Sequence, residues 1–206
     1  MTNITAKRKP RADGLRNRDL IVATARAAWA EGGSEVTLEE IVRRAGLGVG
    51  TLYRHFPTRD ALVEAVYLSE VEKMAEAERE LTATLPPVEA LRQWMLLFVD
   101  FLATKIAMRD ALNGMIGGTT ELYACSGELV RSAMGNLTSR AIEAGEIRLE
   151  FEPLDLLRAV SGISSTSVNP NWPESARRLV DVLIAGIQTQ PGSRDPQSTS
   201  ESTSRR

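Results

Sequence analysis

The segment 37–59, TLEEIVRRAGLGVGTLYRHFPTR, constrains the fold of this chain more than any other stretch. It opens with Thr37, a favourable helix N-cap, and Glu40 three residues later can complete a capping box with it. Apolar residues then recur at helical spacing until Gly46, a residue that tolerates the positive φ of a sharp exit from a helix. A second short helix follows and ends before Pro57, because the residue that precedes a proline avoids the helical region. The segment therefore predicts two short helices joined by a glycine turn.

Two short helices around a tight turn form the helix-turn-helix layout, whose second helix lies in the major groove of duplex DNA. The second helix carries hydroxyl and nitrogen groups suited to phosphates and base edges, from Thr51, Tyr53, Arg54 and His55. Its candidates for burial are Val49, Leu52, Tyr53 and Phe56. The same pattern also fits two surface helices of an ordinary helical bundle, so the pattern alone leaves both interpretations open.

The residues of this segment closely resemble the DNA-binding signature of tetracycline-repressor-type (TetR family) transcriptional regulators. The resemblance covers roughly residues 15–65 and rests on Thr37-Leu38, Ile41, Ala45-Gly46, Gly50-Thr51-Leu52-Tyr53, His55-Phe56-Pro57 and Arg59-Asp60-Ala61-Leu62. Family members often have a serine and a lysine where this chain has Gly48 and Val49, so the operator sequence cannot be taken from relatives. Arg59 stands where a lysine is usual, and the resemblance implies that its charge meets a phosphate.

We expect the DNA contacts of this segment to divide into two groups. A phosphate contact positions the protein on any duplex, whereas a base contact selects a sequence. Contacts with phosphates are expected from Thr37, Thr51, Tyr53, His55 and Arg59. Positions nearer the bases are expected for Val49, Gly50 and Arg54.

Charge and composition divide the chain into four parts. The formal net charge is −2, yet residues 1–60 hold 11 lysines and arginines against 7 acidic residues, so the rest of the chain is acidic. A basic module on an acidic body suits a DNA reader with an attached control domain. We predict a disordered basic arm over 1–14, a three-helix DNA-binding module over 15–60, a helical body over 61–189 and a disordered Ser-, Thr- and Pro-rich tail over 190–206.

Helical periodicity without a convincing strand predicts an all-α fold, in which the body contains five or six helices for ligand binding and dimerisation. The expected helices, beyond the two in the segment above, are 15–32, 58–84, 88–112, 121–145, 153–168 and 174–188. Thr58 is the N-cap of the second of these, whose far half is charged and alanine-rich and is expected to be a solvated strut. Glycines interrupt the pattern over 113–120, which predicts a loop or a broken helix.

Aromatic and methionine side chains gather around the interrupted segment 113–120. These residues are Trp94, Phe98, Phe101, Met108, Met115, Tyr123 and Cys125. Such side chains can line an adaptable apolar cavity, with Asn113, Thr119 and Tyr123 as orienting polar groups. An ordinary filled core would use the same residues, and it is the resemblance to TetR regulators that implies a small, apolar effector here.

The last two helices, 153–168 and 174–188, carry more apolar surface than a peripheral hairpin needs, and their small residues allow close helix approach. We expect two copies of this hairpin to form a four-helix homodimer interface. The two DNA-binding modules of such a dimer, held about 34 Å apart, would then bind the two halves of a palindromic operator.

Enzyme and membrane functions are not indicated. The only histidine is His55 and the only cysteine is Cys125, so a zinc site of the usual Cys/His kind cannot be assembled, and a His-based catalytic arrangement would need His55 to leave its helix face. No phosphate-cradling glycine motif occurs, and we expect neither a metal nor a cofactor. The sequence lacks an apolar signal segment and a stretch of 18 uncharged apolar residues, which leads us to expect a cytoplasmic protein.

These patterns together predict a dimeric transcriptional regulator, a repressor that a bound effector releases from its operator. The alternative from another class is a helical protein-binding adaptor that keeps the helix-turn-helix as a packing module without DNA specificity.

Overall fold

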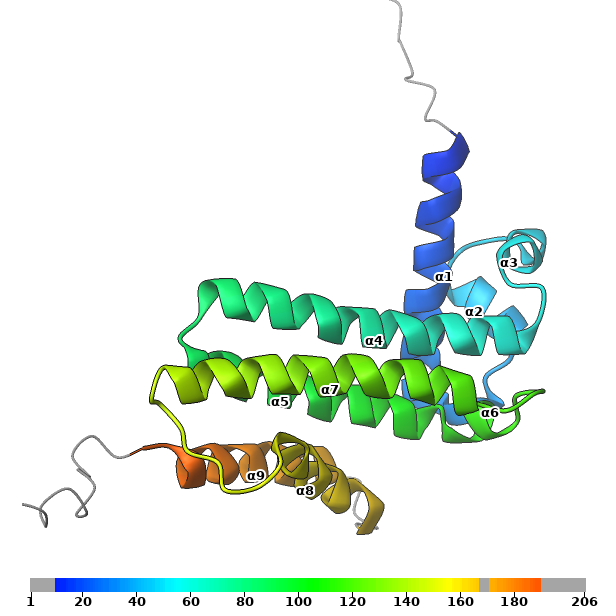
Figure 1. Cartoon of the computed structure of the whole chain (residues 1–206). Helices are drawn as coiled ribbons and strands as arrows, with labels where there is room; N and C mark the ends of the chain where they lie inside the picture. The colour runs from blue at the N-terminus through cyan, green and yellow to red at the C-terminus, as the bar shows by residue number, and fades with distance from the viewer. Residues whose placement is uncertain (1–9, 167–170, 190–206) are drawn as a thin grey trace, which may run out of the picture.

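The computed structural model describes residues 10–166 and 171–189 of the 206-residue chain. Within these ranges the fold is all-α, as the sequence predicts (Figure 1). The elements are α1 (Pro10–Gly32), the 3-10 turn η1 (Gly33–Glu35), α2 (Leu38–Arg44), α3 (Val49–His55), α4 (Arg59–Thr84), α5 (Pro87–Ala107), α6 (Arg109–Asn113), α7 (Thr120–Glu143), α8 (Pro153–Thr166) and α9 (Trp172–Ile187).

The turn between α2 and α3 forms for local reasons. The Thr37 hydroxyl oxygen accepts a hydrogen bond from the backbone N–H of Glu40 at 3.2 Å, which caps α2. The Glu40 carboxylate accepts from two arginines of its own helix instead of completing the capping box. Gly46 has φ +66°, and the next N–H, of Leu47, donates to the carbonyl of Val42 at 3.1 Å. This closing pattern of a helix end requires the left-handed conformation that glycine adopts without strain.

Helix α3 is held by one narrow face. Leu52 and Phe56 are 0% and 2% exposed and pack into the same apolar cluster as Trp29 of α1. Val49 and Tyr53 were also expected to be buried, and this is wrong, because they are 45% and 44% exposed. A helix of two turns that rests on α1 and α2 can bury only one stripe, and these two side chains lie beside it.

Helix α4 joins the DNA-binding module to the body. It begins after Thr58, whose hydroxyl accepts from the N–H of Ala61 at 3.1 Å, and it ends at Thr84 as predicted. The expectation of a solvated far half holds for one face only, where charged residues such as Glu72, Glu76 and Glu80 are exposed. Val71 and Met74 are buried on the other face, since α5 and α7 pack along α4 (Figure 1). The connection is therefore a helix that packs on the body along one face and is open to solvent along the other.

Two helix boundaries differ from the sequence-based expectation. Helix α1 begins at Pro10, so residues 10–14 are helical where a disordered arm was expected. The expected helix 88–112 is divided at Met108 into α5 and α6. The segment between α6 and α7 is a loop, as predicted, in which Gly117 and Gly118 adopt positive φ. The rest of the expected basic arm, residues 1–9, and the expected tail 190–206 lie outside the described residues.

The helices form one body with the helix-turn-helix at one end. Figure 1 shows α1 running across the end of α4, with α2 and α3 beside it, while α8 and α9 lie along the side of the body away from α4. One hydrophobic cluster runs through the molecule, from Ile21 of α1 to Val66 of α4, Trp94 of α5 and Ile184 of α9. Because the DNA-binding module and the body share this core, a change of packing in the body bears directly on α1. None of the described helices is long and apolar enough to cross a membrane.

Candidate DNA-reading surface and effector region

The outward face of α3 presents most of the predicted DNA contacts to solvent. Val49, Gly50, Tyr53 and Arg54 are exposed, and Thr51 and His55 are partly exposed. The helical repeat pairs residue 49 with 53, 50 with 54 and 51 with 55, so these six positions lie on either side of the buried stripe. At the edges of this surface the Tyr53 hydroxyl lies 3.5 Å from a carboxylate oxygen of Glu39 in α2, and the His55 ring lies near Gly14 of α1. The structure thus brings six of the eight predicted DNA contacts onto one surface.

Arg54 is the cation on this surface that the protein leaves available. No described residue forms an ion pair with its guanidinium. The arginines of α2 differ, because Arg44 and Arg43 donate to Glu40 at 2.8 and 2.7 Å and lower the pKa of that carboxyl below its usual value. Arg44 also donates to Glu31 at 2.7 Å. The charges of Arg43 and Arg44 are therefore paired within the protein, whereas the Arg54 guanidinium has no ion-pair partner among the described residues and is available for a DNA contact.

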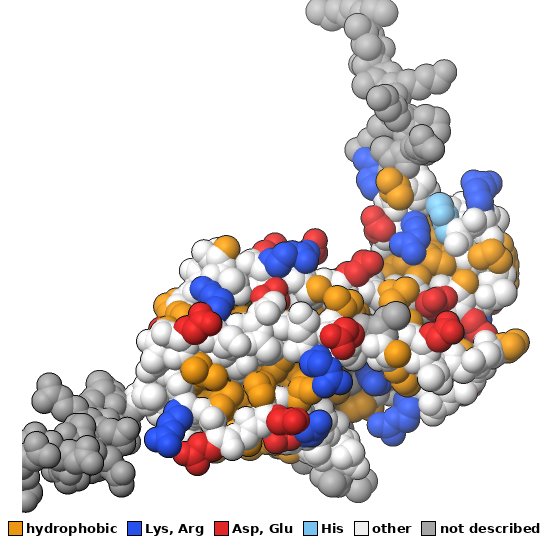
Figure 2. Space-filling model, viewed as in Figure 1, with side chains coloured by type: hydrophobic (Ala, Val, Ile, Leu, Met, Phe, Trp, Pro, Cys, Tyr) orange, Lys and Arg blue, Asp and Glu red, His pale blue; other side chains and the backbone are white. Residues whose placement is uncertain are grey.

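Helix α1 supports the C-terminal end of α3. A side chain at Gly14 would meet the His55 ring at 3.9 Å, and the Arg18 guanidinium lies 5.4 Å from the centre of the Phe56 ring. This contact places Arg18, an exposed cation, next to the outward face of α3. Figure 2 shows basic side chains around this α1–α3 end of the molecule. Sequence reasoning missed Arg18, because only the packing of α1 on α3 brings the two together.

Arg59 and Thr37 are the two predicted contacts that lie off α3. The Arg59 Nη1 donates to the backbone carbonyl of Val36 at 3.0 Å, and its guanidinium lies 5.5 Å from the centre of the Trp29 ring. Arg59 therefore ties the start of α4 to α1 and to Val36, the residue before the N-cap of α2. Thr37 is exposed, and its hydroxyl hydrogen remains available after the oxygen has capped α2. Phosphate contacts from both stay predictions.

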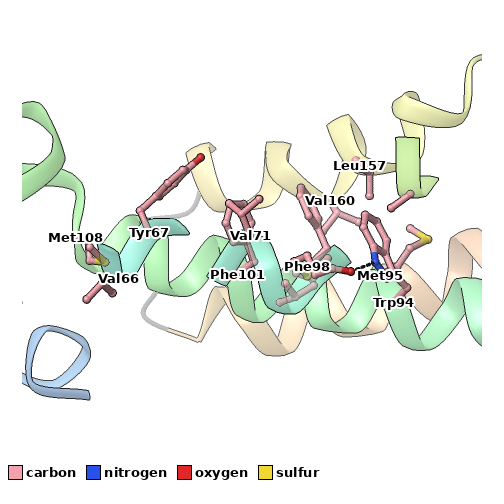
Figure 3. Packing of buried hydrophobic residues seen from close by; sticks show 14 of the residues in the cluster. Val66, Tyr67, Val71, Trp94, Met95, Phe98, Phe101, Met108, Leu157 and Val160 are labelled. Carbon is pink, nitrogen blue, oxygen red and sulfur yellow. Dashed lines mark hydrogen bonds between the residues drawn. The ribbon is translucent and has the colours of Figure 1, made fainter. Parts of the chain in front are cut away.

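The predicted effector residues form a row of rings between α4, α5 and α7. The ring centres of Trp94 and Phe98 are 6.2 Å apart, and those of Phe98 and Phe101 are 6.0 Å apart. Tyr67 of α4 extends the row, with its ring centre 5.9 Å from that of Phe101 (Figure 3). The ring centre of Tyr123 lies 5.6 Å from that of Tyr67. Sequence reasoning missed Tyr67, although its helical spacing from the apolar positions of α4 was a usable signal.

The remaining effector residues surround this row, which consists of Tyr67, Trp94, Phe98, Phe101 and Tyr123. Trp94 is fully buried, and its Nε1 donates to the Met74 carbonyl at 2.9 Å (Figure 3). Met108 is buried and Met115 is partly buried against the same core. The side chain of Cys125 lies outside the described residues. The rings pack against one another as a core does, so ligand binding here stays a prediction.

Polar groups sit at the α7 end of the row. The hydroxyls of Tyr67 and Ser126 share a hydrogen bond of 2.7 Å, and Ser126 also donates to the Tyr123 carbonyl at 3.1 Å. Burial raises the pKa of Tyr67. The Lys105 ammonium lies 4.2 Å from the centre of the Tyr123 ring, and burial lowers the pKa of this lysine. These groups, with Tyr123, are better placed to orient a ligand than the predicted Asn113 and Thr119, which are exposed or partly exposed on the adjoining loop.

Apolar side chains are also exposed on α7, α9 and the segment before α8. Val182 of α9 is 65% exposed, and Leu129, Ile142 and Phe151 are 45–46% exposed. The small residues Ala185 and Gly186 continue the exposed face of α9. Figure 2 shows hydrophobic side chains between α7 and the α8–α9 pair. A face of this composition is typical of a protein–protein interface.

A helix-turn-helix head that is continuous with an all-helical body defines a DNA-binding transcriptional regulator. Comparison with known families agrees for both parts of the chain. Residues 20–66 match the family described as bacterial regulatory proteins, tetR family, and residues 86–189 match the C-terminal domain of SbtR-like transcriptional regulators. The chain belongs to the TetR family, whose members are regulators and not enzymes.

Solved structures and curated proteins of the same family resemble this chain. A TetR transcriptional regulator from Streptomyces coelicolor is 42% identical, with a TM-score of 0.75 over 83% of this chain and 98% of that one. A TetR regulatory protein from Mycobacterium vanbaalenii is 33% identical, with a TM-score of 0.70 over 88% of this chain and 100% of that one. The probable acrEF/envCD operon repressor of Escherichia coli (strain K12) is 29% identical over 108 residues, which are 51% of this chain and 49% of the relative. The chain thus matches about half the length of this curated relative.

Proposed function

We propose that this TetR-family regulator is a cytoplasmic homodimeric repressor, which binds a palindromic operator through two α3 helices and leaves it when a small effector binds the body. The observation that carries the proposal is the outward face of α3, where Arg54 is exposed and no described residue forms an ion pair with it. An unpaired guanidinium at this position is suited to the bidentate recognition of guanine. Repression is supported by the name of the related Escherichia coli protein, a probable operon repressor.

Dimerisation is supported by the exposed apolar face of α9. Ala185 and Gly186 lie one turn after Val182 on the exposed side of α9, and Val182 is 65% exposed. The stripe of one large and two small side chains allows a second α9 to approach closely, as the sequence predicts for helices 153–168 and 174–188. A two-fold dimer presents the same patch from each subunit and matches the symmetry of a palindromic operator.

Effector release is supported by the position of the row of rings beside α4. Tyr67 lies on α4, the helix that continues from the DNA-binding module, and contacts Phe101 of α5 and Tyr123 of α7. A small ligand with apolar surface that inserts between these rings would displace α4, and with it the head. A tenfold to hundredfold release requires that the ligand prefer the released state by about 1.4–2.8 kcal/mol.

The test begins with an operator selected from a random duplex library by the purified protein. Fluorescence anisotropy then compares the wild type with Arg54→Met and with the control Arg131→Met, which replaces an exposed arginine of α7 that forms an ion pair with Glu128. We expect Arg54→Met to lose about 1–3 kcal/mol of operator affinity and to discriminate less between sequences, because a bidentate base contact is lost. Arg131→Met should bind as the wild type does. Equal binding by both variants, or a wild type that ignores duplex DNA at low salt, would refute the proposed reading surface.

A further inference from the structure

Arg18 of α1 lies at the C-terminal end of α3, the helix that carries the proposed base contacts. Its guanidinium is 5.4 Å from the centre of the Phe56 ring, and Phe56 is the residue directly after α3. Phe56 is 2% exposed, whereas Arg18 is exposed, so a buried ring supports the cation at the surface. The position of this charge beside α3 is therefore set by the packing of α1.

The surface next to Arg18 is open on the side of α3. Gly14 precedes Arg18 by one turn on the same face of α1, and a Cβ at Gly14 would lie 3.9 Å from the His55 ring. Because glycine has no side chain, α1 contributes only backbone at this point, and both His55 and Arg18 keep surface that faces solvent. Figure 2 shows basic side chains on both sides of the histidine at this end of the molecule.

The charge of Arg18 has no ion-pair partner among the described residues. Asp19, Glu72 and Glu76 line a hollow of about 250 Å³ between α1 and α4, which Arg18 borders. None of these carboxylates lies within ion-pair distance of the guanidinium in the described part of the chain. Arg18 is in this respect like Arg54, an exposed cation beside the proposed reading surface.

The dimensions of a DNA duplex decide what such a cation can meet. The major groove is about 12 Å wide and an α-helix with its side chains is about 10–12 Å across, so α3 fills the groove that it enters. A cation held on a neighbouring helix, level with the end of α3, then faces the sugar-phosphate backbone at the edge of the groove. We infer that Arg18 donates to a phosphate of the operator, from a helix outside the helix-turn-helix pair. The inference rests on the proposed function and adds to it a contact that is independent of sequence.

A phosphate contact has a signature that a base contact lacks. Each neutralised phosphate releases condensed counterions and contributes about 0.9 to the slope of log affinity against log salt concentration. A dimer presents Arg18 from each subunit, so removal of the charge should reduce this slope by about 1.8. Between 50 and 200 mM salt, the variant should then lose about tenfold less affinity than the wild type loses.

The test measures the affinity of the full-length protein for the selected operator at several salt concentrations, by fluorescence anisotropy. Arg18→Met keeps an aliphatic stem over Phe56 but no charge, and we expect its salt slope to fall by about 1.8. It should weaken the operator and a scrambled duplex by the same factor, whereas Arg54→Met should discriminate less between them. Arg18→Lys keeps the charge and should keep the wild-type slope.

Arg16→Met is the matched control. It removes an arginine of the same helix that points to the other side of α1, where it pairs with Asp13. We expect its salt slope to equal that of the wild type. An equal fall of the slope in Arg16→Met and Arg18→Met would show an effect of net charge alone and would overturn the inference.

A purely structural role for Arg18, as a support for α3 through Phe56, predicts a different pattern. Arg18→Lys and Arg18→Met would then both bind more weakly and melt lower, with the wild-type slope for both, and this result would also overturn the phosphate contact. Arg18→Gln replaces Arg18→Met as the uncharged variant if the latter fails to fold.

Failure of the inference and failure of the proposed function give different results. An unchanged slope in a folded, uncharged Arg18 variant, with operator binding by the wild type intact, would disprove the contact and leave the proposed function standing. A wild type that ignores duplex DNA at low salt would refute the proposed function and this contact with it.

Discussion

Replacement of Arg59 distinguishes a structural role from a DNA contact at the start of α4. In Arg59→Met the hydrogen bond from Nη1 to the Val36 carbonyl, 3.0 Å long, is lost together with the guanidinium 5.5 Å from the Trp29 ring centre. A hydrogen bond from a charged group contributes about 1.5–3 kcal/mol and a cation–π contact about 0.5–1 kcal/mol. Because the hydrogen bond is only part-buried, we take the low end of both ranges, which together give a loss of about 2 kcal/mol of folding free energy. For a chain of this length that lowers the melting temperature by about 4–8 °C.

The assay is thermal unfolding in parallel with operator binding, and Arg59→Lys is the informative companion. Lysine keeps the charge that a phosphate needs, but it lacks the planar guanidinium that reaches Val36 and Trp29 together. The structure predicts that both variants melt lower than the wild type. Arg54→Met, on the exposed face of α3, should melt at the wild-type temperature and lose operator affinity. If Arg59→Met kept its melting temperature and lost only affinity, the structural role argued from these contacts would be refuted.

Three further predictions concern the turn, the core and the dimer. Gly46 has φ +66°, and a Cβ added there would meet no neighbour, so Gly46→Ala should destabilise the fold by about 1–2 kcal/mol through backbone strain alone. Gly50 is equally open but helical, so Gly50→Ala should stabilise the fold by about 0.5–1 kcal/mol. Urea unfolding measures both changes. Burial raises the pKa of Tyr67, so the unfolded chain ionises first as the pH rises. The wild type should then lose stability relative to Tyr67→Phe above about pH 10 and up to the folded-state pKa, and urea titrations on either side of that pH would detect it. Val182→Glu should convert the proposed dimer to a monomer in sedimentation experiments, because it places charge on an apolar face, and an unchanged dimer would exclude α9 from the interface.

The sequence by itself determined the features that depend on neighbouring residues. The caps at Thr37 and Thr58 and the turn at Gly46 use atoms only a few residues apart, so residue type and spacing suffice to predict them. The helix-turn-helix and its outward residues Thr51 and Arg54 follow from the same local signals. The order of the body helices was likewise predictable, because the periodic spacing of apolar residues within each segment predicts a helix there.

The tertiary structure alone decided which surfaces meet. The far half of α4 was expected to be solvated, but α5 and α7 cover one face of it and bury Met74. The DNA contact of Arg59 stays a prediction, but no local pattern indicated that its guanidinium also donates to Val36, 23 residues earlier in the chain. The Tyr67–Ser126 hydrogen bond and the Arg26–Glu70 pair join residues still farther apart. A periodic stripe specifies that a helix face will be buried, but its partner is set by the packing of the whole chain, which no local pattern contains.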